Sequence, residues 1–286
     1  MKNTALKVCT LLMLAVPLFA QAPADTALPK SPWSHSLMGM VSVTQVSFKD
    51  WAQGGENALS WTLSAEGKSE RTGEVLDWSN SYKFAFGQAR LGGLGLRKTD
   101  DKIDLESILT YKLGTFVNPY GAATLKSQFA EGYKYDAQGA ITDTLSRFFD
   151  PAYLTQSVGF GYKPIKEVKT RLGAALREII TSRSTRYSDD PTTSKIEKTK
   201  VEGGVESVTD AQWGLMEDIL LTVKLELFAP FKKFRQVVVR SDNTIAAKVN
   251  KYVSVNLNFQ VIHEPLISPR TQFKETLALG LSYAFF

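Results

Sequence analysis

Histidine, hydroxyl and amide side chains near the end of the chain suggest hydrolytic chemistry. His263 ends an alternating, strand-like segment. That segment carries Ser254, Asn256 and Asn258, and a hydroxyl, an imidazole and an orienting amide or carboxylate are the groups of a nucleophilic triad. Residues two apart on one strand project from the same face about 7 Å apart, so these side chains do not form a hydrogen-bonded triad by themselves. We expect no catalytic residue and keep a lipase or protease as an alternative.

Other sequence motifs of catalytic and binding sites are absent. The chain has no HExxH, phosphate-binding loop, dinucleotide fingerprint or EF-hand pattern. Gly92, Gly93 and Gly95 follow a strand-like segment, but no helix pattern comes after them to direct a phosphate site, so they indicate a turn. The single cysteine, Cys9, lies in the apolar N-terminal segment, and His35 lies in a linker. We therefore predict no metal and no cofactor.

Charged side chains of both signs alternate with apolar ones over much of the chain. Residues two apart on a strand share a face, so these charges would gather on one wet surface. They would either line a pore or pair with one another across a closed lumen. The residues are Glu66, Lys68, Lys83, Asp104, Glu106, Lys112, Lys224 and Glu226.

Residues 1–24 have the pattern of a secretory signal. Two lysines accompany an apolar stretch over residues 8–19, and small residues follow at Ala22 and Ala24. The apolar stretch is shorter than the roughly 20 residues that a spanning helix needs. We predict export by the general secretion machinery, cleavage by signal peptidase, and a periplasmic linker over residues 25–35.

Length and composition limit the fold of the exported part. The 286-residue chain has room for one large β domain or two small domains. Its net charge of +5 falls once the signal lysines are removed, so it gives no case for nucleic acid. After Ala24 there is no run of ten consecutive apolar residues, which excludes spanning helices. Because lipid admits only helices and closed barrels, an exported membrane protein of this kind must be a barrel.

Alternation with a two-residue period marks the strands. Between residues 59 and 68 the odd positions are apolar or small and the even positions are polar, as in a strand with one dry and one wet face. The pattern recurs at residues 103–113, 154–163, 219–227, 253–261 and 277–285. We predict an all-β fold, an antiparallel up-and-down transmembrane β-barrel of about 12 strands over residues 36–286.

Loops and alternatives complete this prediction. Three polar stretches, residues 133–150, 182–200 and 240–244, are expected to be loops, and the long ones belong on the outer face of a barrel. Residues 171–181 also fit a short amphipathic helix, but we favour a strand because the neighbouring segments are strands. A soluble β-sandwich alternates too, since it buries one face of each sheet. A secreted, ligand-binding sandwich is therefore the alternative to the barrel.

The last strand ends in a sequence that resembles a barrel-assembly signal. Gly280, Tyr283 and Phe285 have the spacing G-x-x-aromatic-x-aromatic, and Phe286 extends one residue further. This resembles the β-signal by which outer-membrane proteins engage their barrel-assembly machinery, and an open strand edge can be recognised by strand addition. The resemblance implies that machinery as a partner and outer-membrane lipid as the surroundings.

A second resemblance lies at residues 48–61, FKDWAQGGENALSW. They resemble the opening signature of the DUF3078 family, a Bacteroidetes-type family of outer-membrane proteins of unknown activity. The matching residues are Trp51, Gly54, Gly55, Glu56 and Asn57. Gly54 and Gly55 can supply the positive φ of a tight hairpin turn, which Asn57 could support with a hydrogen bond. An alternative is that Trp51 and Trp61 bind a ligand at the mouth of the barrel.

Residues 241–262 are also similar to the DUF3078 family, which would next have a Tyr-Asp pair where this chain has His263 and Glu264. The resemblance implies a barrel in the cell outer membrane with undefined activity. We expect a passive pore or a structural component of the envelope, and not an enzyme.

Removal of the C-terminal signal gives the first test. Deletion of residues 283–286 should leave the chain in the periplasm, where proteases would clear it, because the strand that the assembly machinery recognises is gone. Immunoblots of outer-membrane and periplasmic fractions measure this. Normal amounts of the truncated chain in the outer membrane would contradict the prediction.

Overall fold

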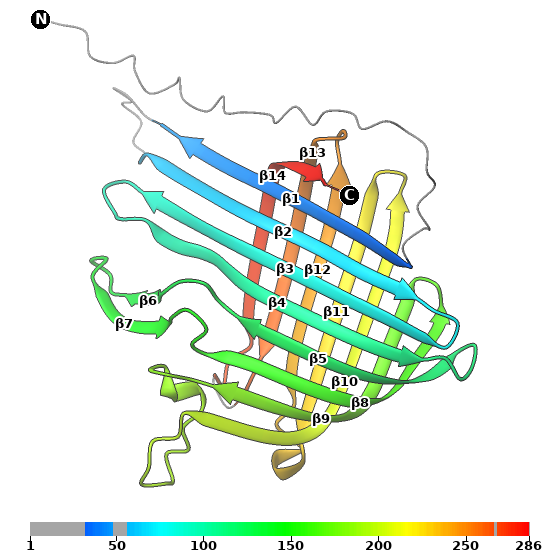
Figure 1. Ribbon diagram of the computed structural model, residues 1–286. Coiled ribbons are helices and arrows are strands. Elements are labelled where there is room, and N and C mark those ends of the chain that lie inside the picture. Colours follow the sequence, from blue (N-terminus) through cyan, green and yellow to red (C-terminus); the bar gives the residue numbers. More distant parts are fainter. Residues whose placement is uncertain (1–31, 48–55, 266–267, 286) are drawn as a thin grey trace, which may run out of the picture. The chain divides into compact units, whose positions relative to one another are not determined.

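The computed structural model describes residues 32–47, 56–265 and 268–285. Within them, twelve strands close into one antiparallel barrel (Figure 1). The expected all-β barrel is thus confirmed, and the sandwich architecture is wrong. No helix in this part of the chain is long and apolar enough to cross a membrane. The expected signal peptide, residues 1–24, lies outside the described residues.

The strands are long. Those of the barrel are β1 (Trp33–Val46), β2 (Ala58–Thr72), β3 (Leu76–Leu91), β4 (Arg97–Tyr111), β5 (Val117–Ser127), β8 (Ala152–Ile165), β9 (Val168–Ile180), β10 (Thr199–Met216), β11 (Ile219–Pro230), β12 (Val238–Lys248), β13 (Val253–His263) and β14 (Gln272–Ala284). A separate hairpin consists of β6 (Gly132–Tyr135) and β7 (Ile141–Ser146), and two 3₁₀ turns lie at Thr185–Tyr187 and Phe231–Lys233. The barrel therefore begins at Trp33, inside the stretch expected to be linker.

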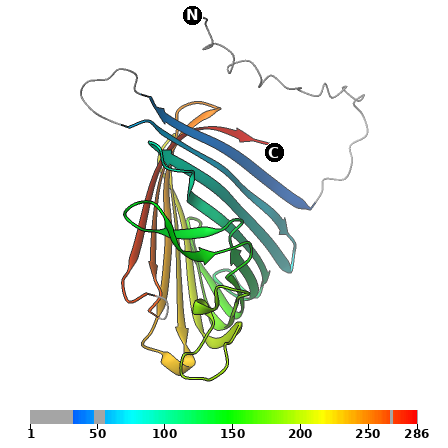
Figure 2. The same ribbon diagram turned by 90° about the vertical axis from the view of Figure 1, so that its left-hand side faces the viewer.

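Strands that follow one another in the sequence are neighbours in the barrel, and β1 closes it against β14. Connections at one end are short turns, such as residues 73–75, 166–167 and 217–218. Those at the other end are longer, such as residues 128–151, which carry the β6–β7 hairpin, and residues 181–198. Figure 2 shows this hairpin standing in front of the barrel wall. In outer-membrane barrels the short turns face the periplasm.

The two faces of the wall differ in polarity. Val158, Leu172 and Leu279 lie on the outer face and are 65%, 59% and 62% exposed. Glu106 and Arg171 lie on the inner face and are 9% and 6% exposed. This inverts the pattern of a water-soluble protein and matches a wall whose apolar face meets lipid.

One expected loop is a strand. Residues 240–244 lie inside β12. Arg240 and Asp242 face the lumen, where they pair with Glu264 and Lys102 respectively. The stretch is polar because its lumen-facing side chains are charged, and its polarity alone wrongly suggested a loop.

The other expectations on secondary structure have mixed outcomes. Residues 171–180 continue strand β9, so the preference for a strand over a helix is confirmed. Residues 133–150 were expected to be a loop but include most of the β6–β7 hairpin. Residues 182–198 are the expected long connection, and β10 begins at Thr199.

Two facing glycines let neighbouring strands and a tyrosine pack closely. Gly159 of β8 pairs with Gly173 of β9, and Tyr120 of β5 pairs with Gly159 from the other side. A Cβ at Gly173 would lie 2.3 Å from the Val158 carbonyl oxygen and 2.7 Å from the Tyr120 hydroxyl. Tyr120 is only 6% exposed, and the Arg171 guanidinium lies 5.9 Å from the centre of its ring.

Substitution Gly173→Ala tests this close approach. We expect it to lower the free energy of unfolding by about 1–3 kcal/mol, because the backbone oxygen that the new methyl meets cannot move aside. The matched control is Gly121→Ala, since a Cβ at Gly121 meets nothing within 4 Å. Urea titration of the barrel in detergent measures both variants, and equal midpoints would contradict the packing argument.

Candidate functional site

A cluster of buried ion pairs joins opposite walls inside the barrel. Glu106 of β4 accepts a hydrogen bond of 2.7 Å from Nη2 of Arg171 on β9. Both Glu106 oxygens accept from Nζ of Lys224 on β11 at 3.0 Å. Arg171 also lies 3.5 Å from Glu206 of β10. We call these four residues the central cluster. Because β4 and β11 lie far apart in the strand order, the cluster closes the lumen between them.

A second set of ion pairs extends the central cluster. Lys126 of β5 donates to Glu226 of β11 and lies 3.9 Å from Asp104. Lys224 in turn lies 3.8 Å from Glu226. A cavity of about 60 Å³ beside Lys126 and Glu226 is the space found at this level. These side chains therefore fill this half of the lumen.

Glu264 holds two arginines at the long-connection end of the lumen. Its carboxylate is buried and accepts from Arg177 of β9 and from Arg240 of β12, the latter at 2.9 Å. The Tyr153 ring lies 5.3 Å from the Arg177 guanidinium and 5.0 Å from that of Arg240. The sequence comparison singled out position 264 only as a departure from a family pattern, and nothing in the spacing of these residues indicated their contact.

The other half of the lumen is lined mainly by neutral polar side chains, with Glu66, Lys68 and Lys83 on the same inner faces. The neutral side chains come from β2, β3, β13 and β14, and each is only partly buried. Several bond to near neighbours, as where Asn256 Nδ2 donates to Ser254 Oγ at 3.4 Å. The residues are Ser60, Thr62, Ser64, Ser79, Ser81, Ser254, Asn256, Asn258, Gln260 and Thr276. We call this side the hydroxyl half of the lumen, and it remains accessible to solvent.

Two ion pairs cross the lumen at the edge of the hydroxyl half. Lys102 of β4 lies 2.8 Å from Asp242 of β12, on the opposite side of the barrel. Lys274 of β14 lies 2.8 Å from Asp100 of β4. The four side chains are between 24% and 38% exposed. We call these the cross-lumen pairs, and they narrow any passage through this half.

Asp150 organises the long connection over residues 181–198. Its buried carboxylate accepts three backbone N–H groups, those of residues 182–184. Burial raises the pKa of Asp150, but these hydrogen bonds outweigh burial and lower the pKa below its usual range. The stabilisation is thus present near neutral pH and is lost as the pH falls through that lowered pKa. Arg186 joins the connection to the β6–β7 hairpin through a 2.9 Å ion pair with Asp143.

Two family models match the chain. "Protein of unknown function (DUF3078)" matches residues 43–133, which confirms the resemblance seen at residues 48–61. "Protein of unknown function, DUF481" matches residues 140–285, more than half of the chain. The chain belongs to the DUF481 family. Residues 241–262 lie within the DUF481 match and beyond the DUF3078 match, so the resemblance to DUF3078 expected there stays a prediction.

Solved structures with similar architecture include several membrane barrels. The translocator domain of autotransporter NalP from Neisseria meningitidis is 9% identical, covers 88% of this chain and 87% of its own, and has a TM-score of 0.37. The COG4313 outer membrane channel from Pseudomonas putida F1 is 14% identical, with coverages of 93% and 99% and a TM-score of 0.38. The NanC porin is 7% identical, with coverages of 87% and 98% and a TM-score of 0.37. Likenesses at this level carry no functional information. No curated protein matches the chain.

The charges expected on the wet face of this DUF481 protein divide into two groups. Asp104, Glu106, Lys224 and Glu226 pair across the lumen, as one of the two alternatives held. Lys112 lies at a short turn, 2.8 Å from Asp77. Within the described residues, Glu66, Lys68 and Lys83 form no ion pair, and the alternative that such charges line a pore stays a prediction for them.

Part of the expected signature turn is described. Trp51, Gly54 and Gly55 lie outside the described residues. Glu56 and Asn57 precede β2, and the Asn57 carbonyl accepts a 2.7 Å hydrogen bond from the backbone N–H of Gly92. Gly92, Gly93 and Gly95 lie in the β3–β4 connection, where Gly92 has a φ of +55°, which agrees with a turn. Trp61 packs edge-on against Phe86 at 5.7 Å.

The expected assembly signal lies at the seam of the barrel. Gly280 pairs with Ser42 and Tyr283 pairs with Gly39, both in β1. The rings of Tyr283 and Phe285 lie 5.1 Å apart, and Phe286 lies outside the described residues. The role of these residues in assembly stays a prediction.

The two histidines occupy different surroundings. His263 Nδ1 lies 3.1 Å from Thr271 Oγ1, and no hydrogen bond joins it to Ser254 among the described residues. His35 Nδ1 lies 2.8 Å from Ser69 Oγ, a contact that sequence reasoning missed because it joins separate strands. No group of three His, Cys, Asp or Glu in the described part of the chain could hold a metal ion.

Removal of the central carboxylate tests the cluster. Glu106→Gln should lower the free energy of unfolding by about 3 kcal/mol, because Arg171 and Lys224 lose their shared buried counter-charge. Glu66→Gln is the matched control, since Glu66 is exposed and has no ion pair in the described residues. Both are measured by urea titration in detergent micelles. A similar small effect for the two variants would show that the cluster does not stabilise the barrel.

Proposed function

We propose that this DUF481 protein is an outer-membrane barrel that forms a narrow, water-filled passage for small polar solutes. One observation carries the proposal. The hydroxyl half of the lumen stays partly exposed, while the half that holds the central cluster is closed. Inward side chains that water still reaches are what a passage requires, and an eight-strand barrel, by contrast, is just filled by its side chains.

The lining suggests which solutes pass. Serine, threonine, asparagine and glutamine can exchange hydrogen bonds with neutral polar molecules. Charges of both signs at the cross-lumen pairs oppose strong selection of anions or cations. The pairs Lys102–Asp242 and Lys274–Asp100 also limit the width of the passage. The proposal therefore favours small, neutral solutes and gives the protein no catalytic activity.

The apolar outer face supports a place in the outer membrane. Exposed leucine, valine and phenylalanine side chains alternate with the polar inner face along β8, β9 and β14. Together with the expected secretory signal and the C-terminal aromatic strand, this supports export by the general secretion machinery and insertion by the barrel-assembly machinery. The periplasm would then face the short turns.

Single-channel recording in planar bilayers tests the passage. The wild-type protein should give small, regular conductance steps. Removal of one cross-lumen pair by Lys102→Ala with Asp242→Ala should raise the step size about twofold, because a bridge across the bore is gone. The control removes the Lys112–Asp77 pair, which lies at a turn. It should leave the steps unchanged.

The protein used for the recordings also shows whether an absence of conductance steps is due to a closed lumen or to an unfolded barrel. A folded barrel migrates differently in cold and in boiled detergent gels. Suppose that the wild-type protein shows the heat-dependent gel shift but gives neither conductance steps in bilayers nor solute-driven swelling of proteoliposomes. That result would contradict the proposed passage and leave a structural role for the barrel.

A further inference from the structure

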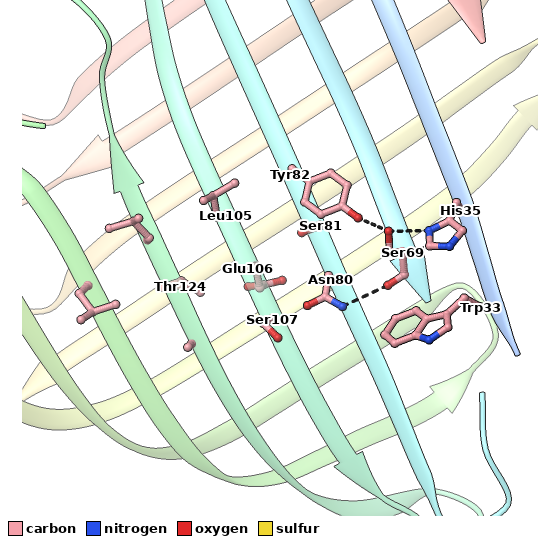
Figure 3. A pocket seen from close by; sticks show the side chains of 13 residues that line it. Trp33, His35, Ser69, Asn80, Ser81, Tyr82, Leu105, Glu106, Ser107 and Thr124 are labelled. Carbon is pink, nitrogen blue, oxygen red and sulfur yellow. Dashed lines mark hydrogen bonds between the residues drawn. The ribbon is translucent and has the colours of Figure 1, made fainter. Parts of the chain in front are cut away.

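A groove with a polar floor opens on the outer face of the barrel. It has a volume of about 500 Å³ and runs across β1 to β5 and β8, from the short-turn ends of β1 and β2 to the long-connection ends of β5 and β8 (Figure 3). His35 pairs with Ser69, Ser69 with Asn80, and Asn80 with Ser107, so these residues share one face of neighbouring strands. Glu106, next to Ser107, points its carboxylate to Arg171 and Lys224 in the lumen. The face with Ser107 is therefore the outer one.

Hydrogen bonds organise the floor of the groove. Ser69 Oγ lies 2.8 Å from His35 Nδ1 and also bonds to the Tyr82 hydroxyl, as Figure 3 shows. Asn80 Nδ2 donates to the Ser69 carbonyl oxygen at 3.5 Å. Ser107 Oγ accepts from Trp78 Nε1 at 2.9 Å. Such a network is unusual on a surface that faces lipid, where a polar group without a partner costs free energy.

The groove continues into an apolar part. Leu105, Ala123, Leu125 and Leu154 line it beyond the polar floor. Leu105 pairs with Leu125, and Leu125 with Leu154, so one row of side chains crosses three strands. This part offers a hydrocarbon chain a place beside the wall.

An arginine stands at the short-turn edge of the groove. Arg71 pairs in register with Trp33 on one side and with Trp78 on the other, and the two indole rings lie 5.3 Å apart. Arg71 is two positions after Ser69 on β2, so it shares the outer face. Arg71 makes no ion pair with any described residue. Tryptophan is typical of the membrane interface, which is also the depth of lipid phosphates.

The polar network of the groove is larger than the other polar contacts on the outer face, such as Thr170 with Thr209 and Asn243 with Ser241. At the short-turn end of the barrel, the outer faces of β13 and β14 present Val253, Leu281 and Tyr283. If these side chains were polar only because they lie at the level of the lipid headgroups, polar side chains would be expected all round the barrel at that level. The gathering of polar side chains in this groove therefore indicates a specific occupant rather than the general surroundings.

We infer that the groove binds one phospholipid of the membrane leaflet at the short-turn end. The phosphate lies against the Arg71 guanidinium, the glycerol and ester oxygens lie on the polar floor, and an acyl chain follows the leucine row. An arginine guanidinium is well suited to phosphate, because its planar donors match the phosphate oxygens. The inference rests on the proposed membrane placement and is independent of the passage.

Native mass spectrometry of the full chain in detergent micelles tests this. Titration with phosphatidylglycerol and phosphatidylethanolamine should show one tightly held lipid per barrel, and diacylglycerol, which lacks the phosphate, should bind more weakly. Arg71→Gln should weaken phospholipid binding about tenfold, as expected for loss of a charge-assisted contact. It should leave diacylglycerol binding unchanged. Arg71→Lys, which keeps the charge, should retain more affinity than Arg71→Gln.

A matched control is Arg90→Gln. Arg90 pairs with Leu59 of β2 and lies at the long-connection end of β3, away from Trp33 and Trp78. Its substitution should leave binding unchanged. Equal lipid retention by wild type and by Arg71→Gln, with both showing the heat-dependent gel shift, would overturn the site.

Three further outcomes identify which part of the proposal fails. Displacement of the bound lipid by inorganic phosphate alone would assign the arginine to a free anion and overturn the lipid site. A protein that conducts in bilayers but holds no phospholipid would overturn this inference only. A protein that does not float with vesicles would overturn the membrane placement itself.

Discussion

The pairing of charges inside a closed wall is the constraint on which the rest of this structure depends. Lipid leaves no partner for a free backbone N–H or C=O, so the strands must close. Closure sends every second side chain into the lumen, and here many of these are charged. A buried charge is costly unless it is paired. Glu106 meets this need by holding Arg171 and Lys224 from two other strands.

The position of the charges divides the lumen. Most of the charges that pair across it lie on β4, β5 and β9 to β12, and ion pairs between these strands fill the space between them. The inner faces of β2, β3 and β13 carry mostly hydroxyls and amides, whose short hydrogen bonds stay along or between adjacent strands. Neutral side chains have no need to reach across the barrel. The open half of the lumen thus follows from where the sequence places its neutral residues.

The alternation of apolar and polar residues was enough to predict the fold. It did not predict the contacts between side chains inside the barrel. Alternation identified strands because a wall between lipid and lumen has a period of two. The same rule failed at residues 240–244, where charged inward residues made a strand look like a loop. The contact of Glu264 with Arg177 joins residues far apart in the sequence, and the groove takes its residues from β1 to β5 and β8. Such contacts depend on register and closure, which one sequence does not reveal.

The seam shows how closure and the C-terminal strand are linked. β1 pairs with β2 over fourteen residue pairs but with β14 over only five, from Met38 to Ser42. Gly280 makes this contact possible, since a Cβ there would lie 2.6 Å from the Val41 carbonyl oxygen. Ser42 Oγ adds a hydrogen bond to the Leu279 carbonyl where the ladder ends. The short ladder uses the same residues that resemble an assembly signal. A strand edge cannot be bound by another protein and closed against β1 at once, so any recognition of this edge by another protein would have to precede closure, and a short seam would make that exchange less costly.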